Sequence, residues 1–77
     1  MANYTVITKD YADGGVMVEI IPMGADATLP NYGNVRRTKV ASGESWYVWS
    51  LVSGQNGLQR TSDAAIKAAA RAIWRLR

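Results

Sequence analysis

Residues 44–53 read E-S-W-Y-V-W-S-L-V-S, a run rich in strand-forming residues with two tryptophans, Trp46 and Trp49, three positions apart. In a β-strand, successive side chains point to opposite faces of the sheet, so residues three positions apart lie on opposite sides. One tryptophan is therefore expected in the core and the other on the opposite face. The flanking sequence decides which one lies outside.

Outward from this stretch, the first 60 residues alternate short strand-like runs with turn-forming residues. The last two runs are expected to form a hairpin closed by a four-residue turn at 42–45. Residues 24–34 form a long connection, and residues 54–60 are expected to be a turn that leads away from the sheet. Four strands are expected, at residues 4–9, 16–23, 35–41 and 46–53.

The chain ends in a run dense in helix formers, DAAIKAAARAIWRLR at 63–77, with Thr61 or Ser62 as the N-terminal cap. At the helical period its apolar residues gather on one side and its basic residues on the other. The sequence therefore predicts one α+β domain over residues 1–77. It consists of an antiparallel sheet of three to four strands with one C-terminal helix packed on one face, in the order β-β-β-β-α.

The expected hairpin register assigns the two tryptophans to their faces. Pairing Ala41 with Trp46 across the four-residue turn puts Arg37 and Lys39 on the same face as Trp46. Burying unpaired basic side chains is costly, so the opposite face, which carries Trp49, is expected beneath the helix. Trp46 is then left on an open face.

An exposed apolar surface on a small protein usually marks an interaction site, and tryptophan and arginine are favoured at binding hot spots. The alternative is that Trp46 only packs along its strand and is half covered by the connection at 24–34. The side chains expected to bind a partner on the open face are Trp46, Val48, Met17, Ile21, Met23, Arg37 and Lys39.

The composition argues against catalysis and against metal or cofactor binding. The chain has no cysteine and no histidine, so it can form neither a Ser-His or Cys-His pair nor a Cys/His zinc site. Its carboxylates are scattered, and its glycines match neither a P-loop nor a dinucleotide fingerprint. We therefore expect no catalytic residues, no metal ligands, no cofactor and no small-molecule substrate.

The basic charge suggests a second class of partner. Residues 36–77 hold eight basic and two acidic residues, a net charge of +6, within a chain whose net charge is +3. Such a half-chain could bind phosphates in DNA or RNA, although a basic helix stripe is equally the solvated side of an amphipathic helix. The nucleic-acid alternative rests on Arg36, Arg37, Lys39, Arg60, Lys67, Arg71 and Arg75, with Arg77 continuing the helix stripe.

The stretch from Trp46 to Ile73 (WYVWSLVSGQNGLQRTSDAAIKAAARAI) resembles the strand-turn-helix ending of small bacterial and phage proteins. The order of a short sheet and one helix is similar to the arm-site DNA-binding domains of phage integrases. In size and style the chain looks like compact phage-encoded inhibitors of host defence, such as anti-CRISPR proteins. The resemblance implies a non-enzymatic binding protein whose partner is a host protein.

The expected location is the cytoplasm, which would be the host cytoplasm for a phage protein. Residues 1–6 lack the basic region and the apolar stretch of a secretory signal, and no apolar run approaches the length that crosses a bilayer. We expect no membrane association. The sequence leaves open whether the open face binds a foreign protein or a second copy of the chain.

Overall fold

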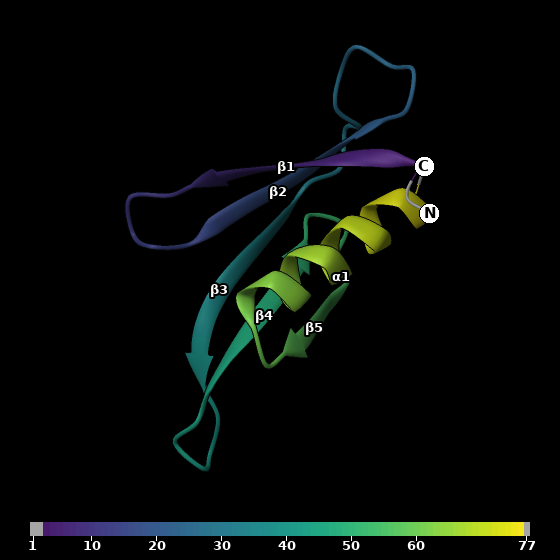
Figure 1. The fold of residues 1–77 in the computed structure, drawn as a ribbon. Coiled ribbons are helices and arrows are strands. Elements are labelled where there is room, and N and C mark those ends of the chain that lie inside the picture. The colour runs from purple at the N-terminus through teal and green to yellow at the C-terminus, as the bar shows by residue number, and fades with distance from the viewer. Residues whose placement is uncertain (1–2, 77) are drawn as a thin grey trace.

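The computed structural model describes residues 3–76, which form one five-stranded antiparallel sheet and one helix (Figure 1). The strands lie side by side in chain order, and the helix α1 lies across one face of the sheet. The predicted α+β class with a C-terminal helix is confirmed, whereas the predicted strand number was one or two too low. The elements are β1 Tyr4–Asp10, β2 Val16–Pro22, β3 Gly33–Lys39, β4 Ser45–Leu51, β5 Asn56–Gln59 and α1 Ser62–Arg75.

The additional strand, β5, lies within the segment that was expected to be only a turn. Gly57 is directly opposite Trp49, and a Cβ at Gly57 would lie 2.7 Å from the indole Nε1 of Trp49. The glycine therefore leaves room for the indole to lie flat on β5. The Asn56-Gly57 pair has the composition of a turn, but packing by an aromatic side chain keeps it in a strand.

Three hairpins are closed by the same kind of turn, at residues 12–14, 41–43 and 52–54. Each turn ends in a glycine with positive φ, at 92°, 86° and 103° in chain order. In the second turn, the Gly43 N–H donates to the Val40 carbonyl at 2.8 Å and the Val40 N–H donates to the Glu44 carbonyl at 3.1 Å. Three-residue hairpin loops commonly end in such a left-handed residue, for which glycine is favoured.

The predicted four-residue turn between β3 and β4 was therefore wrong, and the register differs by three residues. Thr38, and not Ala41, lies opposite Trp46. A shift by an odd number moves every β3 side chain to the other face, so Arg37 and Lys39 lie on the helix side. They remain exposed because the β3–β4 hairpin extends past the end of α1 (Figure 1).

The core lies between α1 and the sheet, and Trp49 packs against it as predicted. The helix approaches the sheet closely at Gly33, where a Cβ would lie 3.5 Å from the Cβ of Ala69. That distance is an ordinary van der Waals contact, so the small Ala69 keeps the helix close, while the space for a side chain at Gly33 is taken by Leu51 of β4. The buried side chains of the core are Val18, Ile20, Val35, Leu51, Ala65, Ala69, Ala70, Ala72 and Ile73.

The helix begins as the sequence predicts. The Thr61 hydroxyl oxygen accepts a hydrogen bond from the Ala64 N–H at 3.1 Å, and Asp63 lies in the first turn, where a negative charge is favourable. Over residues 3–76, no helix combines the length and the apolar character required to span a bilayer.

Candidate functional site

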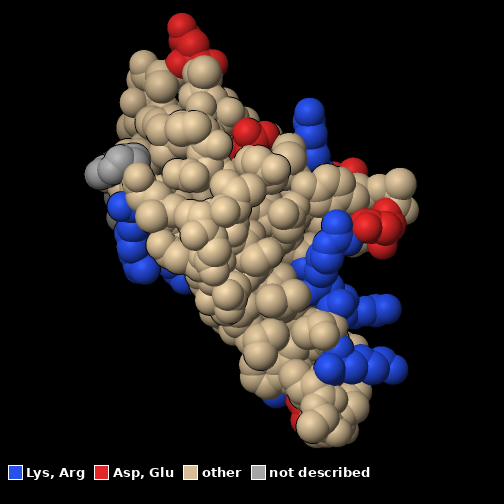
Figure 2. Space-filling view, turned by 180° about the vertical axis from the view of Figure 1, so that it is seen from behind, with Lys and Arg blue, Asp and Glu red and all other residues tan. Residues whose placement is uncertain are grey.

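The face of the sheet turned away from α1, called here the open face, is not covered by another element. The strand pairings place Met17, Ile21, Val48 and Trp46 on it. Each of these four side chains is partly exposed to solvent. Figure 2 shows this side of the molecule: uncharged residues occupy most of it, basic side chains project at both margins, and acidic side chains lie among those at the right. The conclusion that Trp46 lies outside the core is thus confirmed.

A polar row divides the open face into two apolar parts. Asn34, Ser50 and Asn56 are neighbours across β3, β4 and β5. On one side of this row lies Ile21 and on the other lies Val48. The expected apolar surface is therefore not continuous.

The predicted partner-binding residues fall into three groups. Trp46, Val48, Met17 and Ile21 are on the open face. Met17 lies opposite Asn34, in line with the polar row, and only Ile21 lies beyond the row from Trp46 and Val48. Arg37 and Lys39 were wrongly placed there and lie on the helix side. Met23 was expected in the second strand but follows the last residue of β2, and 78% of its surface is exposed.

The part of the open face beyond the polar row carries an apolar strip formed by Trp46, Val48 and Leu58. Val48 lies opposite Leu58 on one side and opposite Arg36 on the other. Leu58 is 49% exposed. The sequence reasoning missed Leu58 because it placed this residue in a turn. Once β5 is recognised as a strand, the alternation of Leu58 with Gly57 and Gln59 is enough to place it.

An arginine covers one end of the strip. The Arg60 guanidinium carbon lies 4.9 Å from the centroid of the Trp46 ring, and its Nη2 is 3.0 Å from Glu44 Oε2. The carboxylate holds the guanidinium over the indole, an arrangement worth roughly 0.5–1 kcal/mol at an exposed site. Trp46, Arg60 and Glu44 form what we call the Arg60 cluster.

The indole N–H of Trp46 is buried and has no hydrogen-bond partner within residues 3–76. A buried donor without an acceptor costs about 1–3 kcal/mol, and the indole N–H of Trp49 is in the same state, so this feature does not set the Arg60 cluster apart. Arg60, and not the connection at 24–34, is the contact found over the Trp46 ring.

A second arginine is held at the β3 side of the strip. The Arg36 guanidinium lies 5.3 Å from the centroid of the Tyr11 ring, and its Nη1 is 2.7 Å from Asp13 Oδ2. The Tyr11 hydroxyl donates to Asn34 Oδ1 at 2.5 Å, which ties the β1–β2 turn to the polar row. Tyr11, Asp13 and Arg36 form the Arg36 cluster. Gly15 lies beneath it, and a Cβ there would lie 2.7 Å from Arg36 Nη1, so a larger residue would displace the guanidinium.

The Asp13 carboxylate is stabilised in its charged form. It accepts the Gly15 N–H at 3.1 Å and binds Arg36, and these two interactions, the first being the larger, lower the pKa of Asp13 below its ordinary value. A lowered folded-state pKa means that the contribution of Asp13 to stability is present above the unfolded pKa. That contribution is lost as the pH falls through the folded pKa.

We therefore expect the Arg36 cluster to open only in acid, below the pH range in which an ordinary aspartate titrates. An NMR titration that follows the Asp13 carboxyl carbon and the Arg36 side-chain signals would show both changes with one midpoint. In Asp13→Asn the Arg36 signals should be independent of pH over this range. An Asp13 midpoint at or above the ordinary aspartate value would contradict the assignment.

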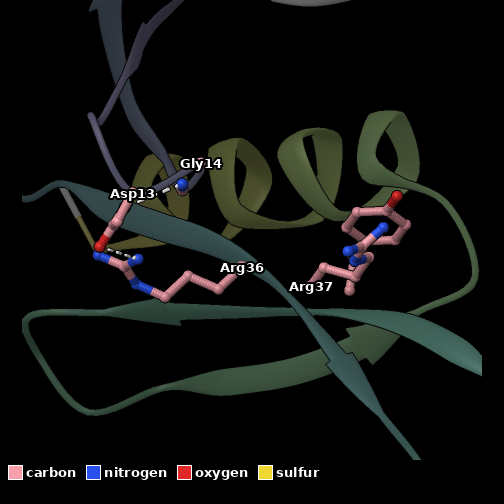
Figure 3. A pocket seen from close by; sticks show the side chains of 6 residues that line it. Asp13, Gly14, Arg36 and Arg37 are labelled. Carbon is pink, nitrogen blue, oxygen red and sulfur yellow. Dashed lines mark hydrogen bonds and ion pairs between the residues drawn. The ribbon is translucent and has the colours of Figure 1, made fainter.

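A polar cleft adjoins the Arg36 cluster where the sheet splits. The β2–β3 pairing extends only from Val16–Val35 to Val18–Gly33, so the β1–β2 turn diverges from β3. The resulting cleft has a volume of about 380 Å³. Figure 3 shows Asp13 beside Arg36 on one side of β3, while Arg37 projects on the other. The lining residues are Asp13, Gly14, Gly15, Arg36, Arg37 and Tyr47.

Arg37 is the cationic group of this cleft that is open to a ligand. Its guanidinium has no ion pair within residues 3–76, unlike that of Arg36. The cleft can therefore accept an acidic side chain. The cleft could not be predicted from the sequence, because its existence depends on how far β2 and β3 remain paired.

The residues predicted for nucleic-acid binding are not brought together. Arg36 and Arg60 lie on the open face and are bound to carboxylates, whereas Arg37 and Lys39 lie on the helix side. On α1, Lys67 Nζ is 3.4 Å from Asp63 Oδ2, and Arg71 and Arg75 are exposed on the same helix. Arg77 lies outside the described residues.

Comparisons with protein-family models, with curated proteins and with solved structures found no match. The described residues also form no group of His, Cys, Asp or Glu side chains that could hold a metal ion. The function is therefore argued from the geometry of the open face.

Proposed function

We propose that the protein is a non-enzymatic, cytoplasmic binding protein that docks the apolar strip of its open face onto a protein partner. The observation that carries the proposal is the strip itself: Trp46, Val48 and Leu58 are at least partly exposed, between two arginines already held in place. Side chains that are ordered before binding lose little conformational entropy when a partner arrives.

The composition of the strip favours a protein over a nucleic acid. Tryptophan and arginine are the residues most enriched at protein-binding hot spots, and the central part of such interfaces is apolar. Arg36 and Arg60 are already bound to carboxylates, which reduces their capacity to bind phosphates. The proposed partner is therefore apolar at the centre of the contact and polar at its rim, where it meets the charged side chains at the margins of this face (Figure 2).

A foreign protein is favoured over a second copy by charge. Each copy carries a net charge of +3, so two copies repel one another overall. An inhibitor of a host defence protein, as the resemblance to small phage proteins implies, would act in this way, by covering a surface of its target.

Site-specific photo-crosslinking tests the proposal. Because the natural chain has no cysteine, Leu58→Cys can carry a benzophenone group at a single position on the strip. The matched control is Asp63→Cys, on the exposed surface of α1. We expect the benzophenone at position 58 to form one discrete adduct with a partner protein. Unlabelled protein should compete with the formation of this adduct, and the adduct should not form when Val48→Glu is also present. After the partner has been identified, the purified partner should give the same adduct.

Adducts that form equally from positions 58 and 63, or that survive Val48→Glu, would contradict docking through the strip. An adduct with twice the mass of the chain, together with a dimer in light scattering, would identify a second copy as the occupant instead.

Nucleic acid is the second candidate partner. It is favoured by two exposed basic residues at the end of β3, Arg37 and Lys39, because neither binds a carboxylate within residues 3–76. Titration of labelled DNA and RNA at two salt concentrations separates the two candidates. Binding that weakens steeply with salt and is lost in Arg37→Glu would displace the protein-docking proposal.

A further inference from the structure

The first strand, β1, has an open edge. The Met23 N–H donates to the Asn3 carbonyl at 2.8 Å, and the Tyr11 N–H donates to the Gly15 carbonyl at 2.7 Å. The backbone N–H and C=O groups of the odd-numbered residues of β1 are therefore directed toward β2. In an antiparallel ladder the alternate residues then direct their N–H and C=O groups away from the partner strand. In β1 these include Tyr4, Val6 and Thr8, and β1 is the outermost strand of the sheet.

A groove runs beside this edge, between β1 and α1, with a volume of about 510 Å³. Its floor is apolar: the rings of Tyr4 and Trp74 lie 5.3 Å apart, and Val6 is 38% exposed. Two of the residues with outward-directed backbone groups, Tyr4 and Val6, therefore also line the groove. The full lining is Asn3, Tyr4, Val6, Lys67, Ala70, Arg71 and Trp74.

The rim of the groove is cationic. Arg71 forms no ion pair within residues 3–76, and the contact of Lys67 with Asp63, at 3.4 Å between exposed side chains, is of the kind that contributes little. An apolar floor, two cations and a row of unsatisfied backbone groups thus lie along one strand. An acidic ligand with an extended backbone satisfies all three.

We propose that the β1 edge and this groove bind an extended segment of another protein, in which apolar residues alternate with acidic ones, as an added strand. Main-chain hydrogen bonds to Tyr4, Val6 and Thr8 would supply a sequence-independent part of the affinity, and the side chains on the helix side would enter the groove. The acidic residues of the segment would bind Arg71 and Lys67. This site is separate from the open face and does not depend on it.

A second copy of the chain fits this edge less well. Its own β1, YTVITKD, offers a single acidic residue, Asp10, at the end of the strand, and also carries Lys9. Edge-to-edge pairing of two copies would leave the cations of both grooves without partners. Charge complementarity therefore favours the acidic peptide.

The probe is a fluorescein-labelled octapeptide in which valine or leucine alternates with glutamate. Its control has lysine in place of each glutamate. We expect the acidic peptide to bind and to shift the amide NMR signals of Tyr4, Val6 and Thr8, while the lysine peptide does not. Arg71→Glu should weaken binding by about tenfold or more, as expected for loss and reversal of a rim charge. The matched variant Arg75→Glu, on the same helix but outside the groove, should bind the acidic peptide as the natural protein does.

Val6→Pro removes one outward-directed N–H and is expected to abolish the amide shifts, because proline is tolerated at such edge positions but cannot donate. If Val6→Pro does not fold, the comparison of Arg71→Glu with Arg75→Glu still tests whether the acidic peptide binds in the groove. Equal binding of the two peptides, equal effects of the two helix variants, or shifts confined to Val48 and Leu58 would overturn the proposal. So would a dimer that is lost in Val6→Pro without any peptide binding. None of these results would bear on the crosslink from position 58.

Discussion

Trp49→Ala is expected to lower the free energy of unfolding by about 3–5 kcal/mol, the range for removing a large aromatic side chain from a core. Trp49 packs against the core beneath α1 and also covers Gly57, so its loss leaves a cavity and exposes the backbone of β5. Small domains are stable by only about 5–15 kcal/mol in total, so this variant should be close to unfolding.

Trp46→Ala is the matched control, because it removes the same side chain from the other face of the same strand. Its expected cost is about 1 kcal/mol, since what it loses is chiefly the contact with Arg60 on the open face. Urea denaturation of both variants, followed by circular dichroism, provides the comparison. Equal costs, or a larger cost for Trp46→Ala, would mean that the faces of β4 are assigned incorrectly.

Gly33→Val is the second substitution with a large expected effect, a loss of about 3 kcal/mol from overpacking. A Cβ at Gly33 would lie 2.7 Å from Leu51 Cδ2 and 3.1 Å from the Ser50 carbonyl oxygen. The leucine side chain can move, but the Ser50 oxygen belongs to the neighbouring strand. The two further methyl groups of valine would also meet the helix at Ala69.

The control for this substitution is Thr38→Val, on the open face of the same strand, where valine suits a strand and is expected to change stability by less than about 0.5 kcal/mol. Thermal unfolding of both variants measures the difference. If Gly33→Val were as stable as Thr38→Val, the close packing of Gly33 against β4 would be incorrect.

The helix could be predicted from the sequence because its signals are local: alanine-rich composition, a threonine cap and an apolar side. The hairpin register could have been predicted from a pattern that recurs in the chain. Ala12-Asp13-Gly14, Ala41-Ser42-Gly43 and Val52-Ser53-Gly54 share a final glycine after a short polar residue. Comparing the three turns would have indicated three-residue loops ending in a left-handed glycine, and with them the correct pairing.

The assignment of Trp46 to the open face was correct although the reasoning for it was not. It rested on keeping Arg37 and Lys39 out of the core, but these residues share the helix side with Trp49 and escape burial because β3 extends beyond α1. Whether a strand side chain is buried depends on the face of the sheet that it occupies and on how far the covering helix extends along the strand. The alternation of residues within the strand gives no information about the extent of the helix.

The two arginine clusters could not be predicted, since each joins segments that are distant in sequence. Arg36 binds Asp13 across 23 positions, and Arg60 meets Glu44 and Trp46 only because β5 pairs with β4. The open edge of β1 and the groove beside it could not be predicted for the same reason. They follow from the strand order and from where the helix lies, and no single stretch of sequence encodes them.

Docking of a partner protein on the open face is tested most directly by measuring how tightly the partner, once identified by crosslinking and purified, binds two variants, Val48→Glu and Val6→Glu. Circular dichroism confirms that both variants are folded. The first places a carboxylate on the partly exposed apolar strip, and the second places one on the exposed part of β1 beside α1. Docking through the open face predicts at least about a tenfold loss of affinity for Val48→Glu and none for Val6→Glu. Unchanged affinity of Val48→Glu would contradict it.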